Sequence, residues 1–477
     1  MFAYDKKDSY TFSFTSPDEL RKYCEDNGYE IPFSKDLSLL GKELKVSTRA
    51  GEKVLKNRLV THPMEGFDGE TNGAPGELTR RRYHRFASSG AALIWSEAIS
   101  IVPEGRTSDH QLFIADHNLD QFKSLMAEIR EISDAPVMAQ LTHSGRFSKN
   151  SSTPHPIFAT RSLPFEAIRP GDKDIPVVTD DYLDRLPEIY AKAAKLAVEA
   201  GFDGIDIKAC HQYLLDELLS AHTREGKYGG SFENRTRFSR EIIEGIKKAV
   251  PGLKISVRLS FFDIIPFVKG EDGVGKPMDW DKNKQYPYAF GGDGTGLGMD
   301  PDLKETSQFV ELLKSYGVDL ICGTIGSPYY SVHMQRPAYY PVVDGYAMPE
   351  HPLYNVGRHL QAVKRIKELH PDIKFVASGL TCLQEYLPNA AEYAVENNWA
   401  DFAGIGRMVL SYPDICADVQ ANNPLQKKRI CRTFGDCTNA PRNGMISGCY
   451  PLDEFYKQKP EAIRLRDLKE KLKKCIK

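Results

Sequence analysis

Short apolar segments alternate with longer amphipathic segments along most of the chain. Each apolar segment is short and bounded by glycine or polar residues, which is typical of a buried strand. The amphipathic segments repeat their apolar positions at helical spacing and are flanked by residues that favour helix ends. The expected strands lie at residues 59–64, 91–98, 136–143, 204–209, 254–260, 319–326, 374–379 and 401–407. The expected helices lie at residues 78–88, 119–132, 182–200, 232–250, 303–316, 353–369 and 384–397.

This alternation predicts one fold class. Eight strands that alternate with helices, without a break in composition, indicate an α/β protein with a single TIM (β/α)8 barrel over residues 45–425. Residues 1–44 are expected to form an N-terminal lead-in that contains a short helix capped by Ser16 and followed by Gly28. Residues 426–477 form a C-terminal tail that contains cysteines. No second domain is expected.

Two long segments interrupt the repeat after the fifth and sixth strands. They cover residues 261–301 and 327–352, and the second contains Tyr329, Tyr330, Tyr339 and Tyr340. Barrel enzymes place their active sites at the strand C-terminal ends, so we expect a lid and an aromatic wall beside the substrate. The alternative is that both loops are decorations or an oligomer contact. The glycine-rich run at 291–298 is not a dinucleotide-binding fingerprint, since Leu297 breaks the pattern and no strand precedes it.

Composition and charge narrow the class of protein. Hydrophobic residues make up 41% of 477 residues, which is enough for a large core. The net charge is −2 and no long basic run occurs, so neither nucleic acid nor an anionic membrane is expected as a partner. No apolar run reaches ~18 residues and the first residues lack a signal-peptide core, which predicts a cytoplasmic protein. Nine scattered cysteines indicate reduced thiols.

Side chains that can carry protons gather at the end of the fourth strand. Lys208, His211 and Tyr213 stand within six residues of one another, where the buried segment GIDI becomes polar. Further on, residues 228–230 supply a tight turn, and Ser231 is a good N-cap for the next helix. The order is therefore strand, functional loop, helix.

The segment from Gly201 to Phe238 resembles the old yellow enzyme family of FMN-dependent ene-reductases, also named NADH:flavin oxidoreductases. The acid–base cluster is followed by a Tyr-Leu-Leu segment and then by the complete motif YGGSxENRxRF at residues 228–238. The resemblance is to the branch near 2,4-dienoyl-CoA reductase and trimethylamine dehydrogenase. Because the chain ends at Lys477, we expect it to lack the C-terminal flavin and nucleotide domains of those relatives.

The resemblance implies a noncovalent FMN site built from strand ends. The residues implied at the flavin ring are Pro63, Met64, Glu65, Ala98, Gln140 and Arg258. Gln140 corresponds to the ligand of the pyrimidine edge, and Arg258 to the cation beside N1 and O2 that holds negative charge on the ring. Family members often have Thr or Cys where Glu65 stands. Taken singly, a Gln or Arg at a strand end is more often a structural hydrogen-bonding group.

A phosphate site is expected after the last two strands. Ser378 and Gly379 follow the seventh strand, and Gly406 and Arg407 follow the eighth, where barrels commonly bind phosphate. Glycine allows the backbone to approach the anion and Arg407 can bind it directly.

The expected reaction passes a hydride from NAD(P)H through FMN to the activated C=C bond of an α,β-unsaturated carbonyl or carboxylate, a small-molecule substrate. Tyr213 is expected to donate the proton to the alpha carbon. Lys208 and His211 are expected to polarise the carbonyl oxygen, where relatives use a His/His or His/Asn pair. Lys208 departs from that pattern and could instead bind a substrate carboxylate. A homo-oligomeric assembly is left open.

Other interpretations of these residues remain open. Lys208 could form an ion pair with one of three carboxylates, Asp206, Glu65 or Glu97, and never touch substrate. His211 could be a buried histidine of the core. A lysine at the end of a barrel strand could also be the nucleophile of a Schiff-base lyase.

Three cysteines of the tail resemble the iron–sulfur segment of the dienoyl-CoA reductase branch. They are Cys431, Cys437 and Cys449, but Phe434 stands where the second ligand is expected, and Cys416 falls at the wrong spacing. Four thiolates usually hold a 4Fe-4S cluster, so no cluster and no other metal is expected. If a cluster were present, these three cysteines would be its ligands, and an iron–sulfur-linked flavin dehydrogenase or reductase would be the alternative function.

Overall fold

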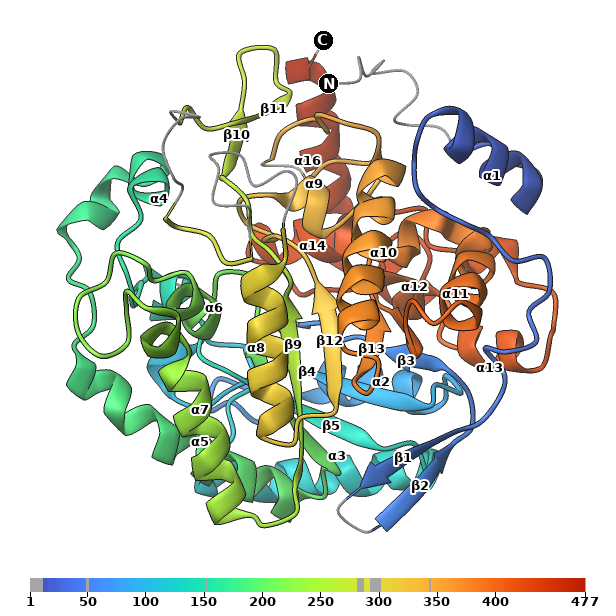
Figure 1. Ribbon diagram of the computed structural model, residues 1–477. Helices are drawn as coiled ribbons and strands as arrows, with labels where there is room; N and C mark the ends of the chain where they lie inside the picture. The colour runs from blue at the N-terminus through green and yellow to red at the C-terminus, as the bar shows by residue number, and fades with distance from the viewer. Residues whose placement is uncertain are drawn as a thin grey trace.

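Eight parallel strands close into a barrel in the computed structural model (Figure 1). The structure describes residues 12–48, 51–150, 153–280, 287–291, 302–342 and 345–476. The barrel strands are β3 (Leu59–Thr61), β4 (Leu93–Ser100), β5 (Val137–Thr142), β8 (Gly204–Ala209), β9 (Lys254–Ser260), β12 (Leu320–Thr324), β13 (Lys374–Ala377) and β14 (Phe402–Ile405). Their order around the barrel is β12-β13-β14-β3-β4-β5-β8-β9, which follows the chain once around. Every expected strand is present, so the predicted single TIM barrel is confirmed.

Helices cover the outside of the barrel (Figure 1). They are α2 (Glu77–Ala87), α3 (Leu119–Ile132), α5 (Asp180–Ala200), α7 (Phe232–Ala249), α8 (Lys304–Ser315), α10 (Pro352–Leu369) and α11 (Leu387–Glu396), followed after β14 by α12 (Arg407–Ser411) and α13 (Ile415–Gln420). The Ser231 side chain accepts a hydrogen bond from the backbone N–H of Asn234, which confirms the predicted cap of α7. The last expected helix begins at Leu387 instead of 384, because Gln384 has φ +54° and kinks the 3-10 segment Leu380–Tyr386 that precedes α11.

The core lies between the helices and the barrel. Residues of β4, β5 and β8 are buried along their whole length, as expected for parallel strands covered by helices. Each helix buries one face on the barrel, and Phe122 of α3, Phe238 of α7 and Phe309 of α8 are fully buried there. This packing fixes the strand ends that carry the polar side chains of the site.

An antiparallel hairpin lies at one end of the barrel. It consists of β1 (Leu44–Thr48) and β2 (Gly51–Leu55), and Figure 1 shows it at the end opposite to α16. Leu55 packs in an apolar cluster with Trp95 and Phe402 of the barrel strands. The hairpin therefore closes the amino end of the barrel, and it was not expected from the sequence.

The N-terminal lead-in packs on the barrel. Helix α1 (Pro17–Asp26) has the predicted cap, in which Ser16 Oγ accepts from the backbone N–H of Glu19 at 3.1 Å. Leu20 and Cys24 of this helix are fully buried in the main core. The domain boundaries at 44/45 and 425/426 stay predictions.

Three insertions follow barrel strands at the carboxyl end. After β9 comes the hairpin β10 (Phe267–Lys269) and β11 (Gly275–Pro277), and after β12 comes α9 (Val332–Gln335). The glycine run at 291–298 lies outside the described residues except for Gly291. A third insertion, not singled out from the sequence, follows β5 and contains β6 (Lys149–Asn150), β7 (Thr153–Pro154) and α4 (Leu163–Ile168). The prediction of a lid stays open.

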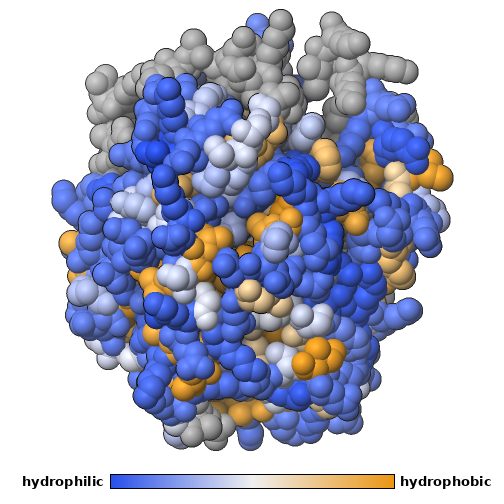
Figure 2. All heavy atoms as spheres, turned by 90° about the vertical axis from the view of Figure 1, so that its right-hand side faces the viewer, coloured by the Kyte–Doolittle hydropathy of each residue, from blue (hydrophilic) through white to orange (hydrophobic). Residues whose placement is uncertain are grey.

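Four further helices and several 3-10 segments lie in the loops and the tail of the described chain. They are α6 (Leu214–Leu219) after β8, and α14 (Asp436–Arg442), α15 (Glu454–Lys457) and α16 (Pro460–Ile476) in the tail, with 3-10 segments at Pro103–Gly105, Asp116–Asn118, Gly145–Phe147, Pro170–Asp174, Leu380–Tyr386 and Lys427–Arg429. The face shown in Figure 2 is mainly hydrophilic with small scattered apolar patches. None of the helices that the structure describes is long and apolar enough to cross a membrane.

Candidate active site

A cavity of ≈ 750 Å³ lies at the carboxyl ends of the barrel strands. Twelve of the thirteen residues expected at the cofactor and catalytic sites line it, although the sequence separates them by more than three hundred positions. They are Pro63, Met64, Glu65, Gln140, Lys208, His211, Tyr213, Arg258, Ser378, Gly379, Gly406 and Arg407. The barrel therefore brings the expected residues together in one place.

Ala98 is the exception. It is fully buried in β4 and is not among the residues that line the cavity. The pairing of β4 with β5 shifts register between Trp95 and Ala98, and the Ala98 carbonyl accepts a hydrogen bond from Gln111 Nε2 at 3.1 Å. A bulge of this kind changes which side chains face the barrel interior. The expected place of Ala98 beside the flavin ring stays a prediction.

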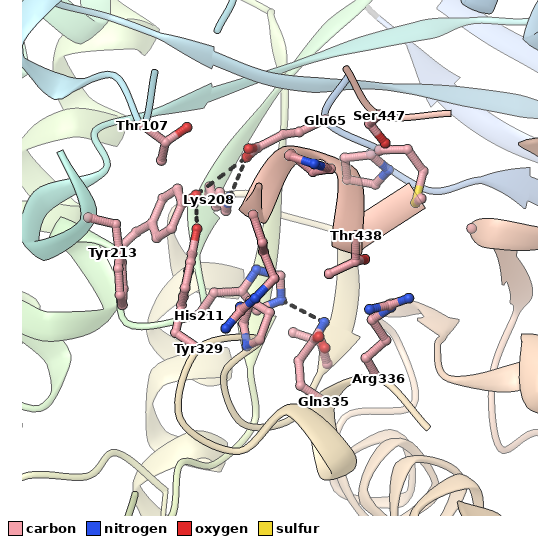
Figure 3. A pocket seen from close by; sticks show the side chains of 18 of the residues that line it. Glu65, Thr107, Lys208, His211, Tyr213, Tyr329, Gln335, Arg336, Thr438 and Ser447 are labelled. Atoms are coloured by element: carbon pink, nitrogen blue, oxygen red, sulfur yellow. Dashed lines mark hydrogen bonds and ion pairs between the residues drawn. The ribbon is translucent and has the colours of Figure 1, made fainter. Parts of the chain in front are cut away.

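Lys208, Glu65 and Tyr213 contact one another at the cavity wall (Figure 3). The Lys208 ammonium lies 3.2 Å from Glu65 Oε1 and 3.6 Å from the centre of the Tyr213 ring. The Tyr213 hydroxyl lies 3.5 Å from the same Glu65 oxygen, at the outer limit of a hydrogen bond. Of the three carboxylates considered for Lys208, the structure selects Glu65, because Asp206 and Glu97 bind other partners.

An aromatic wall continues from Tyr213. Its hydroxyl is 3.1 Å from that of Tyr329, and the Tyr329 ring stacks on Phe147 with centroids 3.7 Å apart. Of the four tyrosines expected after β12, only Tyr329 lines the cavity, whereas Tyr330 stacks on Phe165. The other two make ring contacts elsewhere, Tyr339 with His351 and Tyr340 with Phe434.

Burial sets the protonation of the two other candidate groups. It raises the pKa of Tyr213 well above its usual value, and the negative charge of Glu65 adds to that shift, so the phenol keeps its proton at neutral pH. Burial lowers the pKa of His211 well below its usual value, assisted by the positive charges of Arg258 and Lys208. His211 is therefore a neutral imidazole, and its Nε2 lies 3.1 Å from the amide nitrogen of Gln335.

The backbone that presents His211 and Tyr213 adopts an uncommon conformation. His211 and Gln212 have φ of +69° and +61°, the left-handed region that costs about 1–2 kcal/mol for a residue with a side chain. The backbone N–H of Gln212 donates to Asp216 Oδ2 at 2.6 Å, and that of His211 to Ser260 Oγ at 3.3 Å. Strain of this kind is concentrated at functional sites. We call this segment the left-handed turn.

A buried carboxylate orients the floor of the cavity. Asp206 accepts hydrogen bonds from Gln140 Nε2 at 2.6 Å and from Ser256 Oγ at 2.9 Å. Burial raises the pKa of Asp206 to about 6, although these hydrogen bonds and Arg258 oppose the shift. Gln140 is thereby held by a side chain of β8, and no pattern in the sequence indicated this link between strands.

The expected phosphate side is formed by Ser378, Gly379 and Arg407, whose polar groups are only partly paired. Gly379 has φ +82°, which a glycine adopts without strain, and Arg407 Nη2 donates to the carbonyl of Pro337 at 2.7 Å. Arg407 Nη1 is buried and has no hydrogen-bond partner among the residues that the structure describes. Ser378 Oγ already donates to the carbonyl of Gly323 at 2.5 Å, so its side chain is less available than expected.

Several lining residues were not expected from the sequence. They are His62, Phe67, Thr107, Arg146, Lys149, Arg169, Gln335, Arg336, Thr438, Arg442 and Ser447. Most lie in the insertions after β5 and β12 or in the tail. No local pattern marks them, because loops approach the cavity only through the barrel geometry.

The tail cysteines lie beside the cavity. Cys437 lines it, and Cys431, Cys437, Cys449 and Phe434 also line a second cavity of ≈ 20 Å³. Burial raises the pKa of the Cys431 and Cys449 thiols. Within the described ranges, no three His, Cys, Asp or Glu side chains are arranged to hold a metal ion. The absence of a 4Fe-4S cluster stays a prediction.

Comparisons with known proteins agree with this arrangement. The family described as "NADH:flavin oxidoreductase / NADH oxidase family" matches residues 48–278. The NADPH dehydrogenase of Clostridium acetobutylicum is 33% identical over 362 residues, which cover 75% of this chain and 89% of that protein. The NADPH dehydrogenase of Geobacillus thermodenitrificans is 33% identical over 238 residues, which cover 46% of this chain and 67% of that protein.

Solved structures share the fold. A complex of 2-naphthoyl-CoA reductase with 2-naphthoyl-CoA has a TM-score of 0.66 at 18% identity, covering 88% of this chain and 58% of that one. The old yellow enzyme homologue from Zymomonas mobilis has a TM-score of 0.56 at 21% identity, covering 82% and 94%. The long match to a curated relative, joined to the barrel and its cavity, shows that the chain belongs to the old yellow enzyme family and is an NAD(P)H:flavin oxidoreductase.

Proposed function

We propose that the chain is an FMN-dependent ene-reductase, which uses NAD(P)H to reduce the C=C bond of an α,β-unsaturated carbonyl or carboxylate compound. The observation that carries this proposal is the position of the Tyr213 hydroxyl. It lies at the wall of the cavity, protonated, beside the Lys208 ammonium and on the same loop as His211. A proton donor and two groups for a carbonyl oxygen are what this reduction needs.

The residues present fit FMN. The cavity volume of ≈ 750 Å³ lies within the range of roughly 300–1,000 Å³ that suits a ligand of this size. In the described part of the chain, Arg258 Nε and Arg407 Nη1 are buried nitrogens without hydrogen-bond partners, on the sides expected for the ring and the phosphate. Buried unpaired donors are costly, which favours an anionic or carbonyl-rich occupant. When bound, FMN supplies the hydride.

The residues of this chain then bind the carbonyl group and supply the proton. His211 and Lys208 bind the carbonyl oxygen and stabilise the negative charge that develops on it. Tyr213 transfers its proton to the alpha carbon, and the phenolate that remains lies under the Lys208 ammonium. The hydroxyl of Tyr329, 3.1 Å away, can donate a hydrogen bond to that phenolate.

The contact between Lys208 and Glu65 bears on the alternatives. An ammonium in an ion pair has no lone pair with which to attack a carbonyl, which disfavours the Schiff-base lyase. A substrate carboxylate would have to compete with Glu65 for Lys208, so we favour a carbonyl as the group that Lys208 binds. Glu65 stands where relatives often have Thr or Cys, so this pair distinguishes the chain from the common family pattern.

A narrower placement rests on the tail. The cysteine segment from Cys431 to Cys449 and the fold shared with 2-naphthoyl-CoA reductase support the branch near 2,4-dienoyl-CoA reductase. An iron–sulfur-linked dehydrogenase or reductase is the second candidate; it would need Cys431, Cys437 and Cys449, which line one small cavity but which, within the described ranges, are not arranged to hold a metal ion. Iron and acid-labile sulfide analysis of anaerobically purified protein separates the two.

Replacement of Tyr213 tests the main proposal. The Tyr213→Phe protein should bind flavin and be bleached by NAD(P)H as the parent is, because that step needs no proton on carbon. Its reoxidation by an enone should be about 10²- to 10⁴-fold slower, as for loss of a general acid. Phe147→Leu, which alters the same aromatic wall without a hydroxyl, serves as the control. Equal slowing of both half-reactions by Tyr213→Phe, or of neither, would show that Tyr213 is not the proton donor.

A further inference from the structure

The insertion after β12 contacts the loop after β8 at three points. The Tyr329 hydroxyl lies 3.1 Å from that of Tyr213, and Ser327 Oγ donates to the backbone carbonyl of His211 at 3.4 Å. The third contact joins two side chains that line the cavity, Gln335 and His211, whose Nε2 atoms lie 3.1 Å apart (Figure 3). The insertion therefore holds both the backbone and the imidazole ring of His211.

Gln335 is presented from a segment that is held on both sides. It is the last residue of α9, and the carbonyl of the preceding residue, Met334, accepts a hydrogen bond from His359 Nε2 at 3.1 Å. On the other side, the carbonyl of Pro337 accepts from Arg407 Nη2 at 2.7 Å. A side chain on a supported segment keeps a defined position toward its partner.

The charge state of His211 limits where its ring can carry a proton. Burial lowers its pKa well below the usual value, and Arg258, Lys208 and His359 act in the same direction, so the ring is neutral. A neutral imidazole has one N–H donor and one acceptor nitrogen, whereas the amide nitrogen of glutamine can only donate. Because Gln335 Nε2 donates to His211 Nε2, the ring proton must lie on Nδ1.

The other ring nitrogen remains for a ligand. In the part of the chain that the structure describes, His211 Nδ1 has no hydrogen-bond partner, and it is not sealed off from the cavity. Its N–H group can therefore donate to a ligand oxygen. Lys208, the other donor proposed for this oxygen, already forms an ion pair with Glu65, so the donor on His211 matters more.

We infer that Gln335 is a positioning residue, which fixes the tautomer of His211 so that the Nδ1–H group donates to the carbonyl oxygen of the acceptor. Without Gln335, the ring can carry its proton on either nitrogen. A proton on Nε2 leaves a lone pair on Nδ1, which repels the negative charge that develops on the oxygen. The inference rests on the proposed function, since the oxygen is that of the proposed acceptor.

Nitrogen NMR measures the tautomer without turnover. The purified protein is labelled with 15N-histidine, and the signals of His211 are identified by their loss in His211→Ala. In the parent, Nδ1 should give the signal of a protonated nitrogen and Nε2 that of an unprotonated one. In Gln335→Met, which keeps the length of the side chain without its N–H group, the two signals should move toward each other. A proton on Nε2 in the parent, or identical spectra of parent and Gln335→Met, would overturn the inference.

Reoxidation of the flavin by an enone gives a second readout. Gln335→Met should slow it about 3- to 10-fold, as expected for the loss of one neutral hydrogen bond. The same substitution made in His211→Ala should have no effect, because Gln335 acts through the imidazole. The matched control is Gln361→Met, a glutamine of α10 outside the cavity, which should behave as the parent does. Equal slowing by Gln335→Met with and without His211 would contradict the inference.

A carboxylate at position 335 reverses the hydrogen bond. In Gln335→Glu the side chain accepts from His211 Nε2–H, which raises the pKa of the ring. Below that pKa both nitrogens carry protons, and above it the remaining proton stays on Nε2. The reoxidation rate of Gln335→Glu relative to the parent should therefore fall as the pH rises, and a constant ratio would count against the inference. If the parent reduced no enone, the proposed function would fail, whereas the NMR spectra would still decide whether Gln335 fixes the tautomer.

Discussion

Removal of the positive charge at Lys208 should change the free energy of unfolding by an amount that follows from the structure. The ammonium is 3.2 Å from Glu65, and the two side chains are 4% and 19% exposed. At that separation the Coulomb attraction is about 1.3 kcal/mol in bulk water and about 5 kcal/mol at an effective dielectric constant of 20. Because Glu65 is partly wetted by the cavity, we expect about 2–3 kcal/mol of coupling.

A double-mutant cycle measures that coupling. Lys208→Met keeps most of the stem without the charge, and Glu65→Gln keeps the shape of the acid. The free energy of unfolding of the two single variants, the double variant and the parent is obtained from urea titrations. The losses of unfolding free energy in the two single variants should add up to more than the loss in the double variant, because each single variant leaves one charge unpaired. A coupling below about 0.5 kcal/mol would refute the ion pair as a stabilising contact.

The same substitution tests how Lys208 acts on Tyr213. An ammonium over an aromatic ring contributes about 0.5–2 kcal/mol, so Lys208→Met should slow the proton-dependent half-reaction by up to about 30-fold. Lys227→Met is the matched control, since Lys227 lies over the ring of Tyr228 at 5.4 Å but outside the cavity. Rapid mixing with an enone measures the rate. An unchanged rate in Lys208→Met would remove Lys208 from the proposed reaction.

Three further predictions follow from buried polar groups. Arg407→Leu should weaken FMN binding about 10- to 100-fold in fluorescence titrations, since a charge-assisted contact is lost; unchanged affinity would move the phosphate elsewhere. Asp216→Asn should be nearly neutral, because burial raises the pKa of Asp216 well above its usual value and the amide still accepts from Gln212, whereas Asp216→Ala should cost about 1–3 kcal/mol in urea unfolding. Burial lowers the pKa of His143 to about 3, so its contribution to stability is lost as pH falls below 6.5. At pH 5 that loss is about 2 kcal/mol, and His143→Gln should remove it while His155→Gln, an exposed control, should not.

The barrel and the ends of its helices could be predicted because their signals are local. A run of apolar residues defines β8, and a single serine side chain at Ser231 defines the start of α7. The β1–β2 hairpin gave no such signal, because its strands are five residues each and only partly apolar. Its position depends on the apolar end of the barrel that it covers.

The cofactor residues were predicted from the resemblance to the old yellow enzyme family. The contacts that surround these residues could not be predicted in the same way. The contact of Lys208 with Glu65 joins residues 143 positions apart, and that of Gln140 with Asp206 spans 66. Neither contact follows from a sequence pattern, since each depends on which strands become neighbours and on how side chains fill the floor of the cavity. Ala98 shows the opposite case, in which a bulge in β4 alters the alternation that a sequence pattern assumes.

The β1–β2 hairpin also limits the order in which ligands can bind to the cavity. Because it seals the amino end with an apolar cluster, ligands reach the cavity from the carboxyl end. Under the proposed function, the nicotinamide nucleotide and the acceptor therefore enter through the same opening and bind alternately. The enzyme should show ping-pong kinetics, with parallel double-reciprocal lines, and a high concentration of either ligand should inhibit turnover by blocking the other.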